Sequence, residues 1–162
     1  MSDITEHRTR EGKLYLCVIK DLWSNRIVGW AIDSRMKARI VVAAIEMAAS
    51  RRHGVDLAGC VFHSDRGSQY RARKVHRALR LYGLVGSMGQ VGTAADNASA
   101  ESFFALLQKN VLNTRRWDTR DQLRIAIATW IERTYNQRQN RPGRLTPATY
   151  ETIMTPTTAQ AA

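Results

Sequence analysis

Three strand-like segments joined by short links constrain the fold of this chain more than any other feature. Residues 3–7, 14–19 and 26–32 are apolar or alternating, and only six residues separate each segment from the next. Parallel neighbours need a crossover of about a dozen residues or more, so these links predict an antiparallel meander. Ser24 and Asn25 offer a turn for the second link. The run 14–19 is apolar enough to be covered on both faces.

Helices and further strands are expected after the meander. Apolar residues recur at helical spacing over residues 37–52, and a short apolar strand is expected over 59–63. Ser68 is a good N-cap residue, so the next helix is expected to begin there. Residues 84–86 are expected to form a brief edge strand. This alternation predicts an α/β fold with mixed strand directions.

The last part of the chain is expected to be mainly helical. A glycine-rich loop over residues 87–95 leads to a helix near Asn97, and another helix is expected to begin near Thr119. Beyond Pro142 the chain becomes polar, and its end is expected to be disordered.

Charge and cysteine content indicate the partner and the compartment. The 162 residues carry a formal net charge of +11, which favours nucleic acid as a partner, with a merely soluble basic surface as the alternative. Cys17 and Cys60 lie in apolar runs and are expected to be buried free thiols. No apolar run approaches the roughly 18 residues of a membrane span. We therefore expect a cytoplasmic protein, associated with the nucleoid through its ligand.

The positions of the acidic residues suggest where chemistry could occur. Asp65 ends a predicted buried strand, and the next thirty residues contain no Asp or Glu but six Lys and Arg residues. Ligands of open α/β sheets bind at the carboxyl ends of strands, although Asp65 could simply cap a turn. Glu101 stands near a helix start, where an acid often only offsets the helix dipole. Asp3 lies in the first predicted strand.

If these three carboxylates converge, they form an oxygen-rich pocket of the kind that binds Mg²⁺. Two ions about 3.5–4 Å apart can clamp the attacking and leaving oxygens of an in-line phosphoryl transfer. Bound divalent ions also remove the mutual repulsion of close carboxylates. The hypothesis is a metal-dependent DNA enzyme, in which the acids hold metal and the basic flanks attract phosphate.

Several ordered motifs identify a family. They are Asp3-Ile-Thr, YLCVIKDLWSNRIVGW over residues 15–30, HSDRGSQY over 63–70, DNASAESFFALL over 96–107 and the closing YNQRQNRPGRLTPATYE. Together they closely resemble the integrase catalytic core of insertion-sequence transposases of the OrfB type, relatives of retroviral integrases. Thirty-five residues separate Asp65 from Glu101, which is the spacing of the DD(35)E group.

The resemblance implies a ribonuclease-H-like fold, an α/β fold with a mixed five-stranded sheet and helices on both faces. Strands 1, 2 and 3 would be antiparallel, and strands 1, 4 and 5 parallel. The resemblance covers about residues 3–151, so we expect a core domain over 1–151 and a disordered tail over 152–162. Relatives carry a helix-turn-helix region before the first Asp, so the core is expected to be clipped at its N-terminus.

The resemblance also implies an activity. Asp3, Asp65 and Glu101 match the catalytic, metal-binding acids, which would hold two Mg²⁺ ions, with Mn²⁺ as a substitute. The implied enzyme is a DDE-type polynucleotidyl transferase that nicks transposon ends and joins the exposed 3′-hydroxyl to target DNA. Because inverted repeats come in pairs, a homo-oligomer is expected. Full-length transposase or a separate helix-turn-helix subunit are further candidate partners.

Two other functions stay open. The chain could be a truncated, non-catalytic remnant that binds DNA or inhibits full-length transposase. It could also be a ribonuclease H or another nuclease, since fold alone does not fix function, although the DRGSQY and ESFF motifs favour a transposase.

Residues near the acids each have two candidate roles or a non-catalytic one. His63 shares the strand face of Asp65 and either supports the site or is a structural histidine. Asn97 either hydrogen-bonds around the acids or caps its helix. Asp21 matches a family position that is not catalytic and is expected to be a turn or surface residue. Trp117 could contact a second copy or pack in the core.

Basic residues are expected to contact DNA. Arg71, Lys74 and Arg77 lie along one side of a predicted helix, and a solvated face is the alternative. The expected DNA-binding residues are Arg66, Arg71, Lys74, Arg77 and Lys109. Gln90, Ala95 and Gln108 depart from the Arg or Lys, the Tyr and the Lys that relatives typically carry, and losing a cation weakens phosphate contacts.

Overall fold

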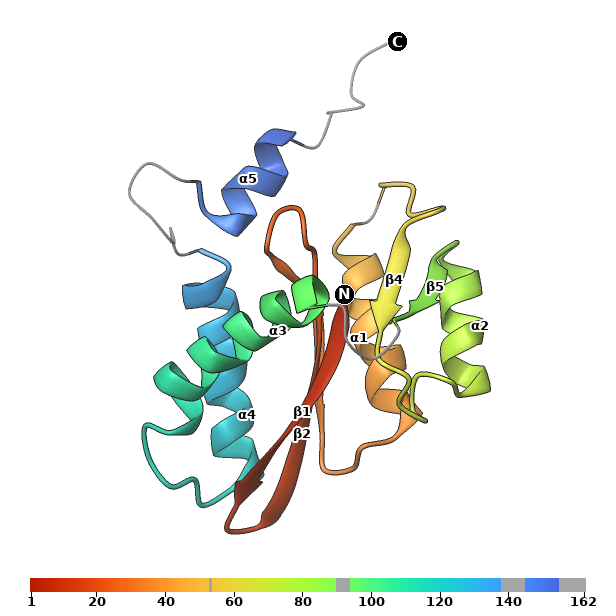
Figure 1. Ribbon diagram of the computed structural model, residues 1–162. Helices are drawn as coiled ribbons and strands as arrows, with labels where there is room; N and C mark the ends of the chain where they lie inside the picture. Colours follow the sequence, from red (N-terminus) through yellow and green to blue (C-terminus); the bar gives the residue numbers. More distant parts are fainter. Residues whose placement is uncertain (53, 90–93, 138–144, 155–162) are drawn as a thin grey trace.

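The computed structural model describes residues 1–52, 54–89, 94–137 and 145–154, apart from the side chains of 94–99 and 151–154. After an initial run of three strands, helices and strands alternate as far as β5, and the elements that follow are helical (Figure 1). In chain order the elements are β1 (Ser2–Thr9), β2 (Gly12–Lys20), β3 (Ile27–Asp33), α1 (Ala38–Ser50), β4 (Val61–Ser64), α2 (Arg73–Leu81), β5 (Val85–Met88), α3 (Ala94–Leu107), the π-helical η1 (Gln108–Leu112), α4 (Arg120–Thr129), the π-helical η2 (Trp130–Tyr135) and α5 (Pro147–Met154).

The first three strands form the predicted antiparallel meander. Strand β2 lies between β1 and β3, with Asp3 opposite Val18 in one pairing and Val18 opposite Trp30 in the other. Asn25 adopts a left-handed backbone conformation (φ 61°) in the link between β2 and β3, which confirms the predicted turn. The meander therefore places Asp3 directly beside the central strand.

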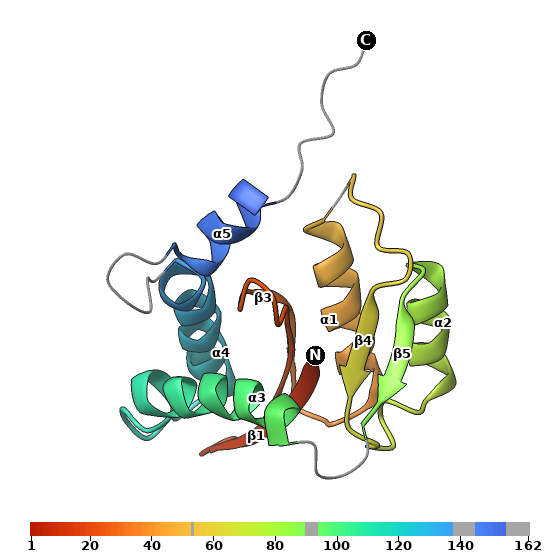
Figure 2. The same ribbon diagram turned by 45° about the horizontal axis from the view of Figure 1, so that its top comes forward.

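Strand β2 is buried on both faces, as its apolar run predicts. Leu14, Leu16 and Val18 belong to one cluster of buried residues, which they share with α3 and α4. Cys17 and Ile19 belong to a second cluster, shared with α1 and α2. Helices therefore cover both faces of the meander (Figure 2).

The remaining strands form a second, parallel sheet. Strands β4 and β5 pair in parallel, with Val61 opposite Val85. Strand β4 lies beside β1, but the ladders of the described residues leave β1-β2-β3 and β4-β5 as two sheets. Strand β4 has only four residues, which leaves few backbone groups with which it could pair to β1. The expected five-stranded sheet is therefore corrected to two adjacent sheets.

Two contacts hold the outer strand β3. Asn136 is buried, donates from Nδ2 to the Ile27 carbonyl (3.1 Å) and accepts from the Ile27 N–H (2.9 Å), as a neighbouring strand would. Helix α1 approaches β3 so closely that a Cβ at Gly29 would lie 2.2 Å from the carbonyl oxygen of Ala44. The meander is therefore fixed from both sides.

Helix α2 begins later than predicted. Ala72 precedes it, and Ser68 lies in an earlier turn in which the N–H groups of Tyr70 and Arg71 donate to the Gly67 carbonyl. The Tyr70 side chain is fully buried, so the chain turns inward here before the helix starts. The predicted N-cap at Ser68 is therefore wrong.

The structure corrects two further expectations. Cys17 is buried, and burial raises the pKa of its thiol to about 12, but Cys60 is exposed because it stands just before β4, at the rim of the sheet. Helix α5 occupies a segment whose polar sequence does not predict it. Pro147 begins this helix, and Thr146 Oγ1 accepts from the Thr149 N–H (3.0 Å).

The helix expected over residues 37–52 is present as α1. Helix α5 continues to Met154, and residues 155–162 of the expected tail lie outside the described residues. Within the described part of the chain, every helix is too short or too polar to cross a bilayer.

Candidate catalytic acids and their basic surroundings

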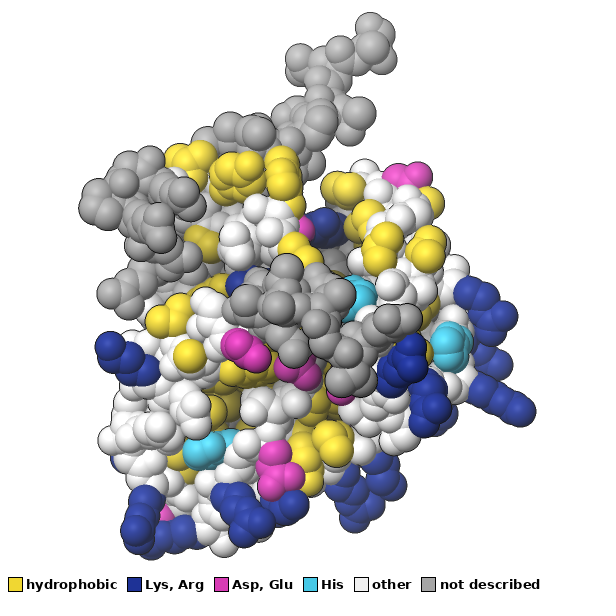
Figure 3. All heavy atoms as spheres, in the orientation of Figure 1, with side chains coloured by type: hydrophobic (Ala, Val, Ile, Leu, Met, Phe, Trp, Pro, Cys, Tyr) yellow, Lys and Arg dark blue, Asp and Glu magenta, His cyan; other side chains and the backbone are white. Residues whose placement is uncertain are grey.

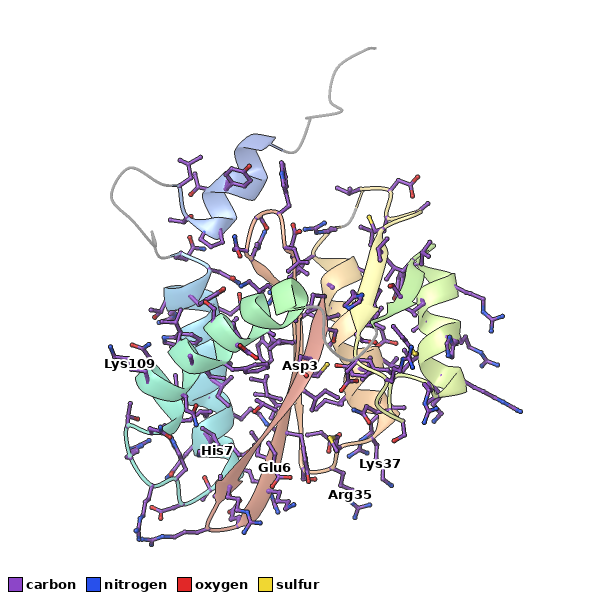
Figure 4. The ribbon with its side chains drawn as sticks, in the orientation of Figure 1. Asp3, Glu6, His7, Arg35, Lys37 and Lys109 are labelled. Carbon is purple, nitrogen blue, oxygen red and sulfur yellow. The ribbon has the colours of Figure 1, made fainter. Side chains whose placement is uncertain are left out.

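Asp3 sits near the start of β1, where the meander meets α3 (Figure 4). Its side chain is half-buried and accepts a hydrogen bond from the Ile4 N–H at Oδ1 (2.7 Å). It lines a small cavity together with Val18 of β2 and with Ala100 and Phe103 of α3. Asp3 is therefore held at the junction of three elements rather than pointing into open solvent.

Asp65 follows β4 immediately and is exposed. Its Oδ1 accepts from the Gly67 N–H (2.8 Å), so the carboxylate shapes its own turn. A Cβ at Gly67 would lie 2.4 Å from Gln69 Nε2 and 2.9 Å from that same oxygen, so a side chain here would crowd the turn. This turn holds one carboxylate oxygen of Asp65 against the backbone.

The fold brings Asp3 and Asp65 close enough to interact. Burial is the main cause of the raised pKa of Asp3. The hydrogen bond from the Ile4 N–H lowers this pKa, and the negative charge of Asp65 raises it further. Strand β1 and strand β4 are neighbours, which accounts for this interaction. Two carboxylates from distant parts of the sequence thus repel each other at one end of the sheets.

Glu101 lies on α3, and its side chain is exposed. The preceding residue, Ala100, is buried and lines the same cavity as Asp3, which places this turn of α3 beside β1. In the part of the chain that the structure describes, His, Cys, Asp and Glu side chains nowhere gather in threes as a metal site would require. The structure therefore brings Asp3 and Asp65 together and leaves Glu101 nearby, outside a closed cluster.

Acidic side chains cross the middle of one face of the molecule, around the place where Asp3 is labelled (Figures 3 and 4). Close carboxylates repel one another, and a divalent cation bound between them would offset that repulsion.

A buried hydroxyl chain lies between the segments that carry the two acids. Ser2 Oγ lies 3.1 Å from the Tyr70 hydroxyl and 3.6 Å from Cys17 Sγ. Burial raises the pKa of Tyr70, and the charges of Cys17, Asp3 and Asp65 raise it further, whereas its bond with Ser2 lowers it. The chain joins the start of β1 to the turn after β4. Sequence reasoning missed this role of Ser2 and Tyr70, although Tyr70 closes the HSDRGSQY motif.

The other predicted residues are placed as follows. His63 Nδ1 lies 3.3 Å from Ser87 Oγ, across the β4–β5 pair. The side chain of Asn97 lies outside the described residues. Asp21 accepts from the Trp23 N–H (3.1 Å) and pairs with Arg52 (2.9 Å), which confirms it as a turn residue.

The basic residues around α2 form an exposed surface, which we call the α2 surface. Val75, Ala78 and Leu79 bury one side of the helix and leave the cations outside (Figure 3). Within the described residues these cations have no ion-pair partner. They are Arg66, Arg71, Arg73, Lys74, Arg77 and Arg80.

Lys109 does not belong to the α2 surface. It lies on η1, on the other side of Asp3 from α2 (Figure 4). Gln108 is exposed beside it, whereas Gln90 and the side chain of Ala95 lie outside the described residues. Trp117 is buried and donates from Nε1 to the Leu112 carbonyl (3.3 Å), so core packing accounts for it.

The pKa of Asp3 predicts a pH dependence of stability without divalent ions. Its pKa is raised above the ordinary value of 3.8, so the folded state binds this proton more tightly than the unfolded state. Stability from Asp3 is therefore present at low pH and is lost as pH rises through the raised pKa. We expect Asp3→Asn to be more stable than wild type at pH 7 and to lose that advantage near pH 4, measured by urea unfolding in EDTA.

Asp33 provides the opposite control. The hydrogen bond from Arg39 is the main cause that lowers the pKa of Asp33, so Asp33→Asn should be less stable than wild type at pH 7. A constant difference between Asp3→Asn and wild type from pH 4 to pH 7 would contradict the prediction.

Comparison with known proteins finds similar sequences among integrase core domains and transposases. An integrase core domain family model matches residues 1–94, and a second integrase core domain model matches residues 82–144. The chain is 37% identical over 151 residues to transposase InsF for insertion sequence IS3A of Escherichia coli K12, covering 92% of this chain and 52% of that protein. It is 35% identical over 143 residues to the transposase of element IS904 of Lactococcus lactis, covering 88% and 56%. The chain thus spans about half the length of these curated relatives.

Two solved structures share the fold. A chain of the simian T-cell lymphotropic virus intasome, in complex with the PP2A regulatory subunit B56 gamma, matches with a TM-score of 0.72 and 12% identity, over 99% of this chain and 55% of that one. The HTLV-2 integrase catalytic core domain, in complex with magnesium, matches with a TM-score of 0.66 and 18% identity, over 91% and 90%. The predicted ribonuclease-H-like α/β fold is thereby confirmed.

Proposed function

Because this chain belongs to the integrase core domain family, we propose that residues 1–151 are the catalytic core of an insertion-sequence transposase. Its reaction would be metal-dependent DNA strand cleavage followed by strand transfer. Transposon ends and target DNA would be the substrates, and the working form would be a homo-oligomer, since paired ends must be brought together.

The observation that carries this proposal is the meeting of Asp3 and Asp65 beside the α2 surface. The negative charge of Asp65 raises the pKa of the half-buried Asp3, so Asp65 acts on a carboxylate whose charge is already disfavoured by burial. Such repulsion costs stability, and functional sites are where proteins commonly carry such a cost. The neighbouring cations of the α2 surface suit a polyphosphate substrate.

The donors present fit a divalent cation. Asp3 and Asp65 supply oxygen ligands of the kind that Mg²⁺ prefers, and Glu101 on the adjacent turn of α3 would complete the set. Bound Mg²⁺, or Mn²⁺ in its place, would neutralise charge that develops during in-line phosphoryl transfer. We therefore propose Asp3, Asp65 and Glu101 as the metal-holding catalytic residues.

The protein's own residues would position the DNA. The exposed Asp65 can reach a phosphodiester at the surface, and the turn bond from Gly67 keeps its carboxylate oriented. The α2 surface would hold the strand by contacts with phosphates, which carry no sequence information. His63 links β4 to β5 and would support the strand that presents Asp65.

Nicking of supercoiled plasmid by the full chain tests the proposal. Nicks that appear with Mg²⁺ or Mn²⁺ and disappear with EDTA would support it. A folded, DNA-binding chain that produces no nick with either ion, on plasmids with or without the inverted repeats, would overturn it.

The α2 surface makes a separate prediction about affinity. Replacing Arg71, Lys74 and Arg77 with Gln should weaken binding to all duplex sequences about equally, because phosphate contacts are lost. The slope of log affinity against log salt should fall by roughly 3, about 0.9 for each contact. Fluorescence anisotropy with duplexes of unrelated sequence measures both quantities. Unchanged affinity after the triple substitution would mean that this face is merely solvated.

A further inference from the structure

A second basic surface lies at the far end of the meander, away from both the acids and α2. It is a groove of about 570 Å³ between the β1–β2 hairpin and the segment that joins η1 to α4. Its lining includes His7, Arg8, Arg10, Arg115, Arg116 and Trp117, with no Asp or Glu. We call it the arginine groove. Basic side chains gather at this lower edge of the molecule (Figure 3).

Backbone contacts make the arginine groove a built feature rather than a chance meeting of long side chains. The Arg10 N–H donates to the Trp117 carbonyl (3.0 Å), and the Glu11 N–H donates to the Asp118 carbonyl (3.3 Å). Arg120 adds bonds from its guanidinium to the carbonyls of Glu11 (2.7 Å) and Lys13 (3.0 Å). These bonds hold two segments a hundred residues apart at a fixed separation.

The arginines of the groove are held only loosely by other charges. Arg8 reaches Glu6 at 3.9 Å and is 80% exposed, and Arg10 pairs with Asp118 at 3.1 Å and is 73% exposed. Exposed pairs of this kind contribute little, so both guanidiniums are free to exchange partners. Arg116 has no ion-pair partner among the described residues.

Arg115 is oriented by an aromatic ring. Its guanidinium carbon lies 4.2 Å from the ring centre of Trp117, which is itself buried. The guanidinium therefore lies over the face of a ring that the core holds in place. Planar, preset guanidiniums suit the paired oxygens of phosphate groups.

The position of the groove suggests which polyanion it takes. Strand β1 (Ser2–Thr9) runs from the acids to the groove, and the seven steps from Asp3 to Arg10 span roughly 23 Å of extended chain. That length corresponds to roughly seven base pairs of duplex DNA. The acids thus lie between the α2 surface and the arginine groove, so a single duplex could contact both.

We propose that the arginine groove binds the phosphate backbone of the DNA duplex on which the acids act. The proposal rests on the proposed function for the identity of that duplex. The groove holds DNA a fixed distance from the reacting phosphate and contributes to affinity without sequence preference.

The test is binding of the full chain to a labelled duplex of about 30 base pairs, long enough to span both basic surfaces. Anisotropy is measured in EDTA, so no cleavage is needed. Arg8→Gln/Arg116→Gln should raise the Kd about tenfold or more near 0.1 M salt and lower the salt slope by about 2. Arg8→Lys/Arg116→Lys keeps both charges and should restore most of the affinity.

The matched control is Arg35→Gln/Arg133→Gln, which removes the same charge from exposed positions outside the groove. It should change the Kd only slightly. Equal Kd values for the groove variant and this control would overturn the proposal. It would also be overturned if the groove variant kept its affinity for DNA and lost binding to an acidic protein.

Plasmid nicking separates this proposal from the proposed function. If wild type nicks DNA and the groove variant binds like wild type, the groove proposal fails and the function stands. If wild type never nicks but the groove variant loses DNA affinity, the groove proposal stands and the catalytic function fails.

Discussion

Asp65→Asn is expected to abolish metal-dependent nicking, with a loss of at least about 1000-fold, equivalent to roughly 4 kcal/mol of transition-state stabilisation. The amide has the shape of the carboxylate, and its oxygen can still accept the Gly67 N–H bond that sets the turn. Only the charge is lost, and with it the capacity to hold a divalent cation against Asp3. Because Asp65 is exposed, the free energy of unfolding should change by no more than about 0.5 kcal/mol.

Asp56→Asn is the matched control. Asp56 is also exposed, and its Oδ1 accepts from the Ala58 N–H (2.8 Å), the same kind of turn bond as that of Asp65. This variant should nick plasmid at the wild-type rate. An Asp65→Asn protein that keeps nicking within about threefold of wild type, a difference below 1 kcal/mol, would place the catalytic acids elsewhere.

The sequence predicts the elements of this fold better than their junctions. Short links are enough to predict the meander, and the apolar run of β2 predicts burial on both faces, because both depend on local composition. Ser68 fails as a predicted cap because the burial of Tyr70, a tertiary contact, delays the helix. The predicted burial of Cys60 is wrong because an apolar run does not reveal which of its residues lie at the edge of the fold.

In the candidate site, too, local motifs propose the residues, whereas the contacts between them depend on tertiary packing. The motifs that resemble the integrase core propose Asp3, Asp65 and Glu101 as candidates, but which of them meet depends on packing between layers. The hydroxyl chain from Ser2 to Tyr70 joins two segments through one hydrogen bond, and no local pattern encodes such a partner. The arginine groove was missed for the same reason, since its two halves look like ordinary surface charge in the sequence.

Phe103→Ala should cause the largest loss of stability among the substitutions considered, about 3–5 kcal/mol of the free energy of unfolding. Phe103 is fully buried, and its ring centre lies 4.9 Å from that of Tyr135, 5.3 Å from Phe104 and 5.8 Å from Trp130. Its removal leaves a cavity between α3, α4 and the meander. The total free energy of unfolding of a domain is commonly only about 5–15 kcal/mol, so the midpoint of urea unfolding should shift strongly.

The same substitution should also affect catalysis, because Phe103 and Asp3 line one cavity and Glu101 lies only two residues before Phe103. Loss of the ring frees the turn of α3 that carries Glu101, so nicking at low temperature should fall by more than the unfolded fraction explains. Phe104→Ala removes a half-buried ring from the same helix and should cost less stability. If Phe103→Ala lost activity only in proportion to unfolding, α3 would not need this anchor to present Glu101 to the other two acids.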